Sequence, residues 1–320
     1  MRRTALALAA ACLAVTAASA ADWPTKPVRI IAPFAAGGAA DALGRLVAEP
    51  LSDVFKEQFF VENRGGAGGR IGELAGAKAE PDGYTLVISA MSASVVAPAS
   101  TPNIGYDPMK DFTHIAYLGG SPNVLVVHPS LPARNFKDLL AYLKSHKEGT
   151  GYISAGLGTA GNLLAEALAR KENFKIDHIP YKGAGPAMVD LVAGHVKLGS
   201  VTWSSALTQI KAGKVLPLAV SSAARMPEAP EIPTLKELGY PDLVSVTWFG
   251  LSAPAGLPKD IVEKLNREAT KALQTPALKA KLASEGFAPE PMLAAEYSAF
   301  VASELAKWGP LAKALMMKKK

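Results

Sequence analysis

The sequence has one cysteine in 320 residues, and this residue, Cys12, lies in an N-terminal segment that we expect to be removed. The remaining chain then has no thiol. This absence excludes disulfides, zinc–thiolate sites, iron–sulfur clusters and cysteine nucleophiles together.

A strong charge of one sign is also missing. Without Arg2 and Arg3 the chain has 32 basic and 28 acidic residues, which gives a formal charge of +4. The basic residues are scattered along the chain, except for the three lysines at 318–320. Nucleic-acid binding usually needs a basic stripe interleaved with aromatic residues, and the sequence shows none, so we expect no nucleic-acid partner. No segment after residue 20 has the length of a transmembrane helix.

The first twenty residues have the pattern of a signal peptide. Arg2 and Arg3 are followed by an apolar run at 5–16 that is too short to span a bilayer, and then by the small residues Ala18, Ser19 and Ala20. We therefore expect residues 1–20 to be cleaved and the mature protein to be exported. An uncleaved N-terminal membrane anchor is the less favoured alternative.

Short apolar strands alternate with amphipathic helices along most of the chain, which predicts an α/β fold of mostly parallel sheets. The expected strands are 28–34, 85–89, 124–127, 152–154, 178–180, 198–202 and 216–221, and the expected helices are 39–55, 136–146, 160–170 and 184–193. A further strand at 246–251 precedes three helices, at 259–274, 276–285 and 294–313.

No long Gly/Ser linker separates the two halves of this pattern. We therefore expect two α/β domains whose chain crossings lie on ordered strands, near 116–122 and 243–249. The predicted domains are 21–121 with 247–320, and 122–246.

Two loops share one design, in which small residues join a strand end to a helix start. They are 35–41 (AAGGAAD) and 155–162 (AGLGTAGN). Such loops let the backbone approach a ligand, and the free N–H groups and positive dipole end of the helix favour an anion. One loop in each half predicts an anion held between two domains, although tight packing alone would also explain either loop. Neither loop has a dinucleotide or phosphate-loop fingerprint, and Asp41 is expected mainly as a helix cap.

Several longer segments resemble the Bug family, the TctC-type solute-binding proteins of tripartite tricarboxylate transport systems. The resemblance covers essentially the whole mature chain. The segments that carry it are 23–31 (WPTKPVRII), 33–38 (PFAAGG) with Asp41, 61–69 (VENRGGAGG), 81–86 (PDGYTL), 106–108 (YDP) with 111–112 (DF), 178–183 (HIPYKG) and 248–251 (WFGL).

This resemblance implies a periplasmic-binding-protein-like (type II) Venus flytrap, with two α/β domains and a hinge. It implies a periplasmic, monomeric protein that has no cofactor and no metal. Its partners would be a small organic carboxylate and the membrane components of a tripartite tricarboxylate transporter. The predicted ligand-binding residues are Phe34, Ala36, Gly37, Gly38, Ala39, Asp41, Ser92, Ser154, Gly158, Thr159, Ala184 and Thr202, together with Trp203, which is proposed from a departure from the family pattern.

The stretch at 200–205 (SVTWSS) departs from the family pattern, which often has an acidic or amide residue here. The Trp203 ring can stack on a flat ligand, but it cannot pair with an ammonium group. We therefore expect a carboxylate without an amino group, either a dicarboxylate or an aromatic carboxylate. The alternative is that Trp203 only packs the hinge.

Two other functions compete with carboxylate transport. A secreted α/β hydrolase is disfavoured, because the sequence lacks a Gly-x-Ser-x-Gly elbow and its five histidines are not at metal-ligand spacing. We therefore expect no enzyme. A receptor that signals to a membrane sensor kinase requires the same clamshell, and the sequence leaves this alternative open.

Overall fold

The computed structural model describes residues 23–316, so the predicted signal peptide at 1–20 lies outside the described residues. The strands are β1 Val28–Ala32, β2 Phe59–Asn63, β3 Thr85–Ala90, β4 Phe112–Val127, β5 Thr150–Ser154, β6 Ile176–Pro180, β7 Leu198–Thr202, β8 Leu216–Val220 and β9 Val246–Pro254. The helices are α1 Ala39–Phe55, α2 Arg70–Ala77, α3 Ala97–Ser100, α4 Phe136–Ser145, α5 Ala160–Glu172, α6 Ala184–Val192, α7 Trp203–Lys211, α8 Lys259–Gln274, α9 Pro276–Ser284 and α10 Ala294–Met316. Three short turns of helix complete the chain: η2 Ala67–Gly69, η3 Ser92–Val96 (a π-helix) and η4 Pro241–Leu243.

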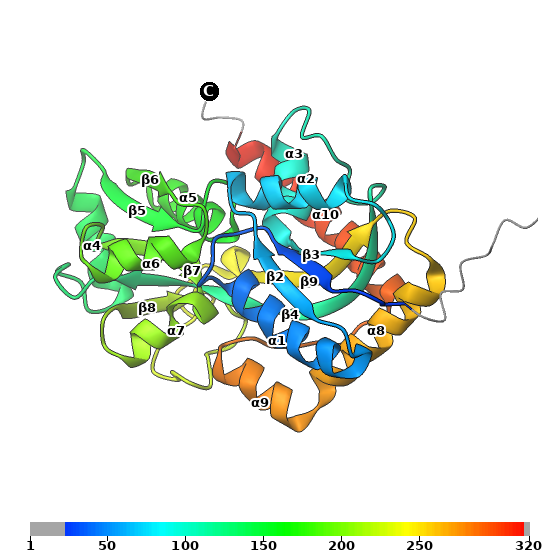
Figure 1. Cartoon of the computed structure of the whole chain (residues 1–320). Coiled ribbons are helices and arrows are strands. Elements are labelled where there is room, and N and C mark those ends of the chain that lie inside the picture. Colours follow the sequence, from blue (N-terminus) through cyan, green and yellow to red (C-terminus); the bar gives the residue numbers. More distant parts are fainter. Residues whose placement is uncertain (1–22, 317–320) are drawn as a thin grey trace, which may run out of the picture.

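The strands form a continuous path in the order β2-β1-β3-β9-β4-β7-β5-β6, with β8 also paired to β4. Strand β4 changes partners along its length, because Phe112–Pro122 pairs with β9 whereas Asn123–Val127 pairs with β7 and β8. We call the part built on β1, β2, β3, β9 and the first section of β4 lobe I, and the part built on β5 to β8 and the rest of β4 lobe II. In Figure 1 lobe II is mostly green, and the orange and red C-terminal helices return to the blue and cyan lobe I.

The domain limits 21–121 with 247–320 and 122–246 stay a prediction. The change of partner on β4 supports them, since it falls between Pro122 and Asn123. Both expected crossings, 116–122 and 243–249, include residues of the antiparallel β4–β9 pair, which reaches as far as Pro122 and Val246.

The sheet is mixed, so the prediction of mostly parallel sheets is wrong. Within residues 23–316, four strand pairs are parallel and four are antiparallel. The physical reason is that β4 and β9 run between the lobes in opposite directions, so each lies antiparallel to its neighbours. The helices that follow β1, β5 and β6 still make the parallel connections that the sequence predicts.

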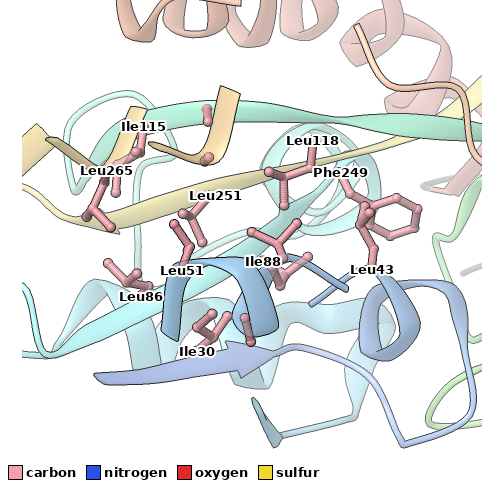
Figure 2. Packing of buried hydrophobic residues seen from close by; sticks show 14 of the residues in the cluster. Ile30, Leu43, Leu51, Leu86, Ile88, Ile115, Leu118, Phe249, Leu251 and Leu265 are labelled. Carbon is pink, nitrogen blue, oxygen red and sulfur yellow. The ribbon is translucent and has the colours of Figure 1, made fainter. Parts of the chain in front are cut away.

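Helix α1 has the predicted bounds and packs its apolar face on the sheet of lobe I. Leu43, Val47 and Leu51 are fully buried, and Figure 2 shows Leu43 and Leu51 among the strand residues Ile30 and Ile88. Burying one such side chain contributes about 1.5–3 kcal/mol. Because this face anchors α1 to the core, the start of the helix is held in a fixed position at the cleft.

Lobe II has its own apolar clusters on the two faces of its strands. Leu125, Val127 and Tyr152 belong to one cluster, whereas Val126 and Ile153 belong to the other. This alternation along β4 and β5 is expected of strands that are covered on both faces. Among residues 23–316, no helix combines the length and the hydrophobicity needed to cross a membrane.

A buried carboxyl group lies beneath the π-helix. Glu73 is 1% exposed, and its Oε1 accepts a hydrogen bond from Ser94 Oγ at 2.9 Å, whereas its Oε2 has no partner among the described residues. Burial raises the pKa of Glu73 to about 8. The group is therefore protonated at neutral pH, and Ser94 shares the π-helix with Ser92 of the cleft.

This raised pKa predicts a pH-dependent stability. The folded protein binds the Glu73 proton more tightly than the unfolded chain does, so the stability from this group is complete below about pH 4.5 and is lost as the pH rises through about 8. Glu73→Gln keeps the shape and removes the titration. We expect it to be more stable than the wild type at pH 9, by at least about 1.4 kcal/mol, the equivalent of one pKa unit.

Thermal denaturation at several pH values between 4.5 and 9 measures this effect. The exposed residue Glu80 provides the control, since Glu80→Gln should leave the pH dependence unchanged. A Glu73→Gln protein that keeps the wild-type slope above pH 7 would show that the interpretation is wrong.

Candidate functional site

The two Gly-rich loops have the same local geometry. The Gly37 N–H donates to Asp41 Oδ2 at 3.0 Å, and the Gly158 N–H donates to Asn162 Oδ1 at 2.9 Å. In each loop the acceptor lies four residues later, in the first turn of α1 or α5. Both glycines have a positive φ, +80° and +77°, which side chains rarely tolerate. The side chains of Asp41 and Asn162 therefore set the shape of the two loops.

Asp41 is a paired carboxylate in the first turn of α1. Arg45 Nε donates to Asp41 Oδ1 at 3.0 Å, and Asp41 is 7% exposed. Burial alone raises the pKa of Asp41, but the hydrogen bonds from Gly37 and Arg45 outweigh it, so the pKa of this carboxyl is below its usual value. The charge of Asp41 is thus balanced by Arg45, which reduces its repulsion of an anion at the helix start.

Four helix starts converge on one cavity between the lobes, whose empty space of about 440 Å³ includes the part open to solvent. Helix α1 comes from lobe I, and α5, α6 and α7 come from lobe II. The residues that line the cavity are Phe34, Gly38, Ala39, Ala40, Ser92, Asn123, Ala155, Thr159, Ala160, Gly161, Ala184, Ser200, Val201, Thr202, Ser205, Thr247 and Phe249. Each helix start carries N–H groups without an intrahelical acceptor and a partial positive charge, so their convergence favours an anion.

The described lining of this cavity holds no Asp, Glu, Lys, Arg or His. It offers hydroxyl groups and one amide instead. The Asn123 Nδ2 group donates to Thr247 Oγ1 at 3.2 Å, and Ser200 Oγ is buried without a partner among residues 23–316. Phe34 and Phe249 supply apolar surface. Such a site suits a small molecule with an acidic end and an apolar body.

The two lobes touch across this cleft. The Ala35 N–H donates to Lys182 O at 2.8 Å, and the Ala39 N–H donates to Ser205 Oγ at 3.2 Å. A Cβ atom built on Gly185 of lobe II would lie 2.1 Å from Ala36 O of lobe I. The absence of a side chain at Gly185 therefore allows the backbones to meet.

The structure brings seven of the thirteen predicted residues to the cavity lining. They are Phe34, Gly38, Ala39, Ser92, Thr159, Ala184 and Thr202. The other six, Ala36, Gly37, Asp41, Ser154, Gly158 and Trp203, do not line it. Gly37, Asp41 and Gly158 shape the loops instead, and the buried Ser154 hydroxyl bonds to Gly156 and to His178 Nε2, the latter at 2.7 Å.

The stacking role predicted for Trp203 is wrong in this conformation. Trp203 is fully buried and packs within an apolar cluster of lobe II that includes Val124 and Val201. It is the first residue of α7, so its side chain lies behind the helix start while Thr202 and Ser205 reach the cavity. A large ring with an apolar pocket available gains more by burial than by exposure at the cleft. This agrees with the packing alternative.

Several lining residues were not predicted from the sequence, above all Asn123, Ser200, Ser205, Thr247 and Phe249. Asn123 and Thr247 lie where β4 and β9 pass between the lobes. The sequence predicted that the chain crosses between the lobes near these two residues. A polar residue at such a crossing could therefore have indicated a ligand contact. Ser200 and Ser205 gave no such signal, because single serines are common in strands and helix starts.

The architecture matches solved protein structures over nearly the whole chain. The periplasmic binding protein BugD superimposes with a TM-score of 0.87 at 33% identity, covering 92% of this chain and 98% of BugD. Rpa4515 of R. palustris, solved with adipate, gives 0.88 at 33% identity, covering 91% and 97% of the two chains. MatC of Rhodopseudomonas palustris, solved with malate, gives 0.84 at 29% identity, covering 91% and 100%. The fold is that of a periplasmic solute-binding protein.

The sequence comparison narrows this class to a family. Protein BugT of Bordetella pertussis is 36% identical over 291 residues, which cover 91% of this chain and 89% of BugT. Residues 43–317 match the TctC family, described as the tripartite tricarboxylate transporter family receptor. The chain belongs to this family, as the motifs in the sequence indicated.

The close contact between Gly185 and the backbone of the opposite lobe predicts the effect of adding one methyl group at this position. Gly185 has no positive φ, so Gly185→Ala adds no backbone strain, but its Cβ would clash with Ala36 O of the opposite lobe. We expect this variant to favour separated lobes. Amide exchange at Ala35 and Ala39, whose N–H groups bond across the cleft, should be faster, while exchange at Ile88 in the core stays unchanged.

Gly309→Ala serves as the matched control, since a Cβ there would lie 3.7 Å from Ala99 Cβ, an ordinary contact. Hydrogen exchange followed by mass spectrometry or NMR compares the two variants. Unchanged exchange at Ala35 in Gly185→Ala would contradict the role of this glycine.

Proposed function

We propose that this protein captures a small organic carboxylate in the cavity between its lobes and delivers it to a tripartite tricarboxylate transporter. The observation that carries the proposal is the convergence of four helix starts on a cavity whose described lining has no charged side chain. A carboxylate placed there would meet amide N–H groups and hydroxyls from both lobes. A helix start contributes about 0.3–1 kcal/mol to an anion at an exposed site and up to about 2 kcal/mol at a partly buried one.

The solved relatives support the ligand class. Rpa4515 was solved with adipate and MatC with malate, and both are dicarboxylates. Trp203 is buried away from the cavity, so it cannot stack on an aromatic ligand there. We therefore propose an aliphatic carboxylate, with Phe34 and Phe249 against its methylene groups.

Binding and closure are coupled in this proposal. The cavity is lined by residues of both lobes, so a ligand gains its full set of contacts only when the lobes meet. Such a ligand shifts the population toward the closed form. The closed form would then be the species that the membrane components recognise, in the periplasm.

We propose no catalytic role for the site. Ser154 and His178 form a serine–histidine hydrogen bond, which resembles the start of a catalytic pair. However, the Ser154 side chain is completely buried, also bonds to Gly156, and does not line the cavity. A substrate in the cavity would therefore not reach it. The sensor-kinase alternative would use the same closure, and a genetic test of uptake separates it from transport.

Titration of the purified mature protein with carboxylates tests the proposal. We expect adipate or malate to raise the melting temperature, because a ligand that binds only the folded state stabilises it by mass action. Uncharged analogues, such as adipamide, should not do so. If no mono-, di- or tricarboxylate bound, as judged by calorimetry, the proposal would be overturned.

Ser200→Ala examines the cavity more closely. The Ser200 hydroxyl has no hydrogen-bond partner among the described residues, so its removal should leave the stability of the ligand-free protein unchanged or slightly higher. If the bound carboxylate uses this hydroxyl, its affinity should fall by about 3- to 10-fold, as expected for one hydrogen bond. An unchanged affinity would remove Ser200 from the set of ligand contacts.

A further inference from the structure

A second cavity lies beside the first and is also bounded by both lobes. It has an empty volume of about 590 Å³ and is lined by Arg70, Ser92, Ser100 and Thr101 of lobe I and by Leu157 and Gly158 of lobe II, among others. It thus belongs to the cleft, not to the outer surface of one lobe.

The two cavities are neighbours at three places. Ser92 lines both of them. Gly158 of the second cavity is followed directly by Thr159 of the first. A Cβ atom built on Gly69, the residue before Arg70, would lie 3.0 Å from Cζ of Phe34, which lines the first cavity. The two cavities are therefore adjacent, with Ser92 between them.

Among the described residues that line either cavity, Arg70 is the one with a charged side chain. It is partly buried at the start of α2, and its guanidinium makes no hydrogen bond or ion pair within residues 23–316. The neighbouring arginines differ, since Arg45 pairs with Asp41 and Arg64 pairs with Glu62. A guanidinium is always charged and presents its donors in a fork that matches a carboxylate.

We propose that Arg70 binds a second carboxylate of the ligand, so that the protein selects dicarboxylates over monocarboxylates. This inference rests on the proposed function, because the first carboxylate is held at the helix starts of the first cavity. The second carboxylate lies in the second cavity against Arg70, and the methylene chain passes Ser92. The first subsite uses N–H groups and hydroxyls without a charged side chain, and the second uses a full positive charge.

Calorimetry with matched ligands tests this assignment. The probes are succinate, adipate and suberate, each compared with the monocarboxylate of equal length, namely butanoate, hexanoate and octanoate. We expect the wild type to prefer one length of dicarboxylate over its monocarboxylate. Arg70→Gln should lower the affinity for that dicarboxylate by about 10- to 100-fold, as expected for a charge-assisted contact, and leave the monocarboxylate affinity within about 2-fold.

Two further variants complete the design. Arg70→Lys keeps the charge but not the fork, so it should restore only part of the affinity. Lys137→Gln removes an exposed cation of α4 that lines neither cavity, and it should leave all affinities unchanged. Circular dichroism and the melting temperature of each variant show that it is folded.

The outcomes separate the two levels of the proposal. If the wild type binds dicarboxylates and Arg70→Gln binds them equally well, the Arg70 assignment is wrong while the proposed function stands. A loss of monocarboxylate and dicarboxylate affinity by the same factor would also count against a role limited to the second carboxylate. If the wild type binds none of the six probes, both the Arg70 assignment and the proposed binding of aliphatic carboxylates are wrong.

Discussion

The structure of the site depends on how closely the backbones of the two lobes approach each other. Cβ atoms at Gly185, Gly68 and Gly65 would lie 2.1 Å, 2.3 Å and 2.5 Å from carbonyl oxygens of the opposite lobe. Contacts this short are possible only because these residues have no side chain. The close approach brings main-chain groups of both lobes together beside the first cavity. The described lining of that cavity offers hydroxyl groups, one side-chain amide and the N–H groups of helix starts in place of Lys or Arg.

We expect the strands that pass between the lobes, β4 and β9, to act as the hinge when the cleft opens. Chain segments cross through β4 and β9, which are paired from Phe112 to Pro122 and show two register shifts, next to His114 and Tyr117. Irregular pairing of this kind increases the local twist, and Gly119 there has a φ of +127°. Hinge motion is usually absorbed by a few residues of this type. We expect the helices to keep their packing within each lobe, so that the helix starts move with their lobe as rigid groups.

The sequence predicted the fold better than the details of the site. The spacing of Leu43, Val47 and Leu51 gave the bounds of α1, because one helix face packs on one sheet. The mixed pairing of β4 and β9 was not predictable, since strand direction depends on contacts between distant segments. The loops at 35–41 and 155–162 were found from their small residues, but which atoms face the cavity depends on the positive φ angles at Gly37 and Gly158. Trp203 shows the same limit, because the sequence does not say on which side of α7 its ring is buried.

The bonds that close the lobes also bear on how a ligand is held and released. The Ala39 N–H, at the start of α1, bonds to Ser205 Oγ of lobe II, and Ser205 Oγ also lies 2.7 Å from Thr202 Oγ1. All three residues line the cavity, so an anion at the helix starts competes for the same donors. The free energy of binding is then the difference between new bonds to the ligand and existing bonds between the lobes. Opening the lobes would remove all the ligand contacts of one lobe at once, which would allow the ligand to be released.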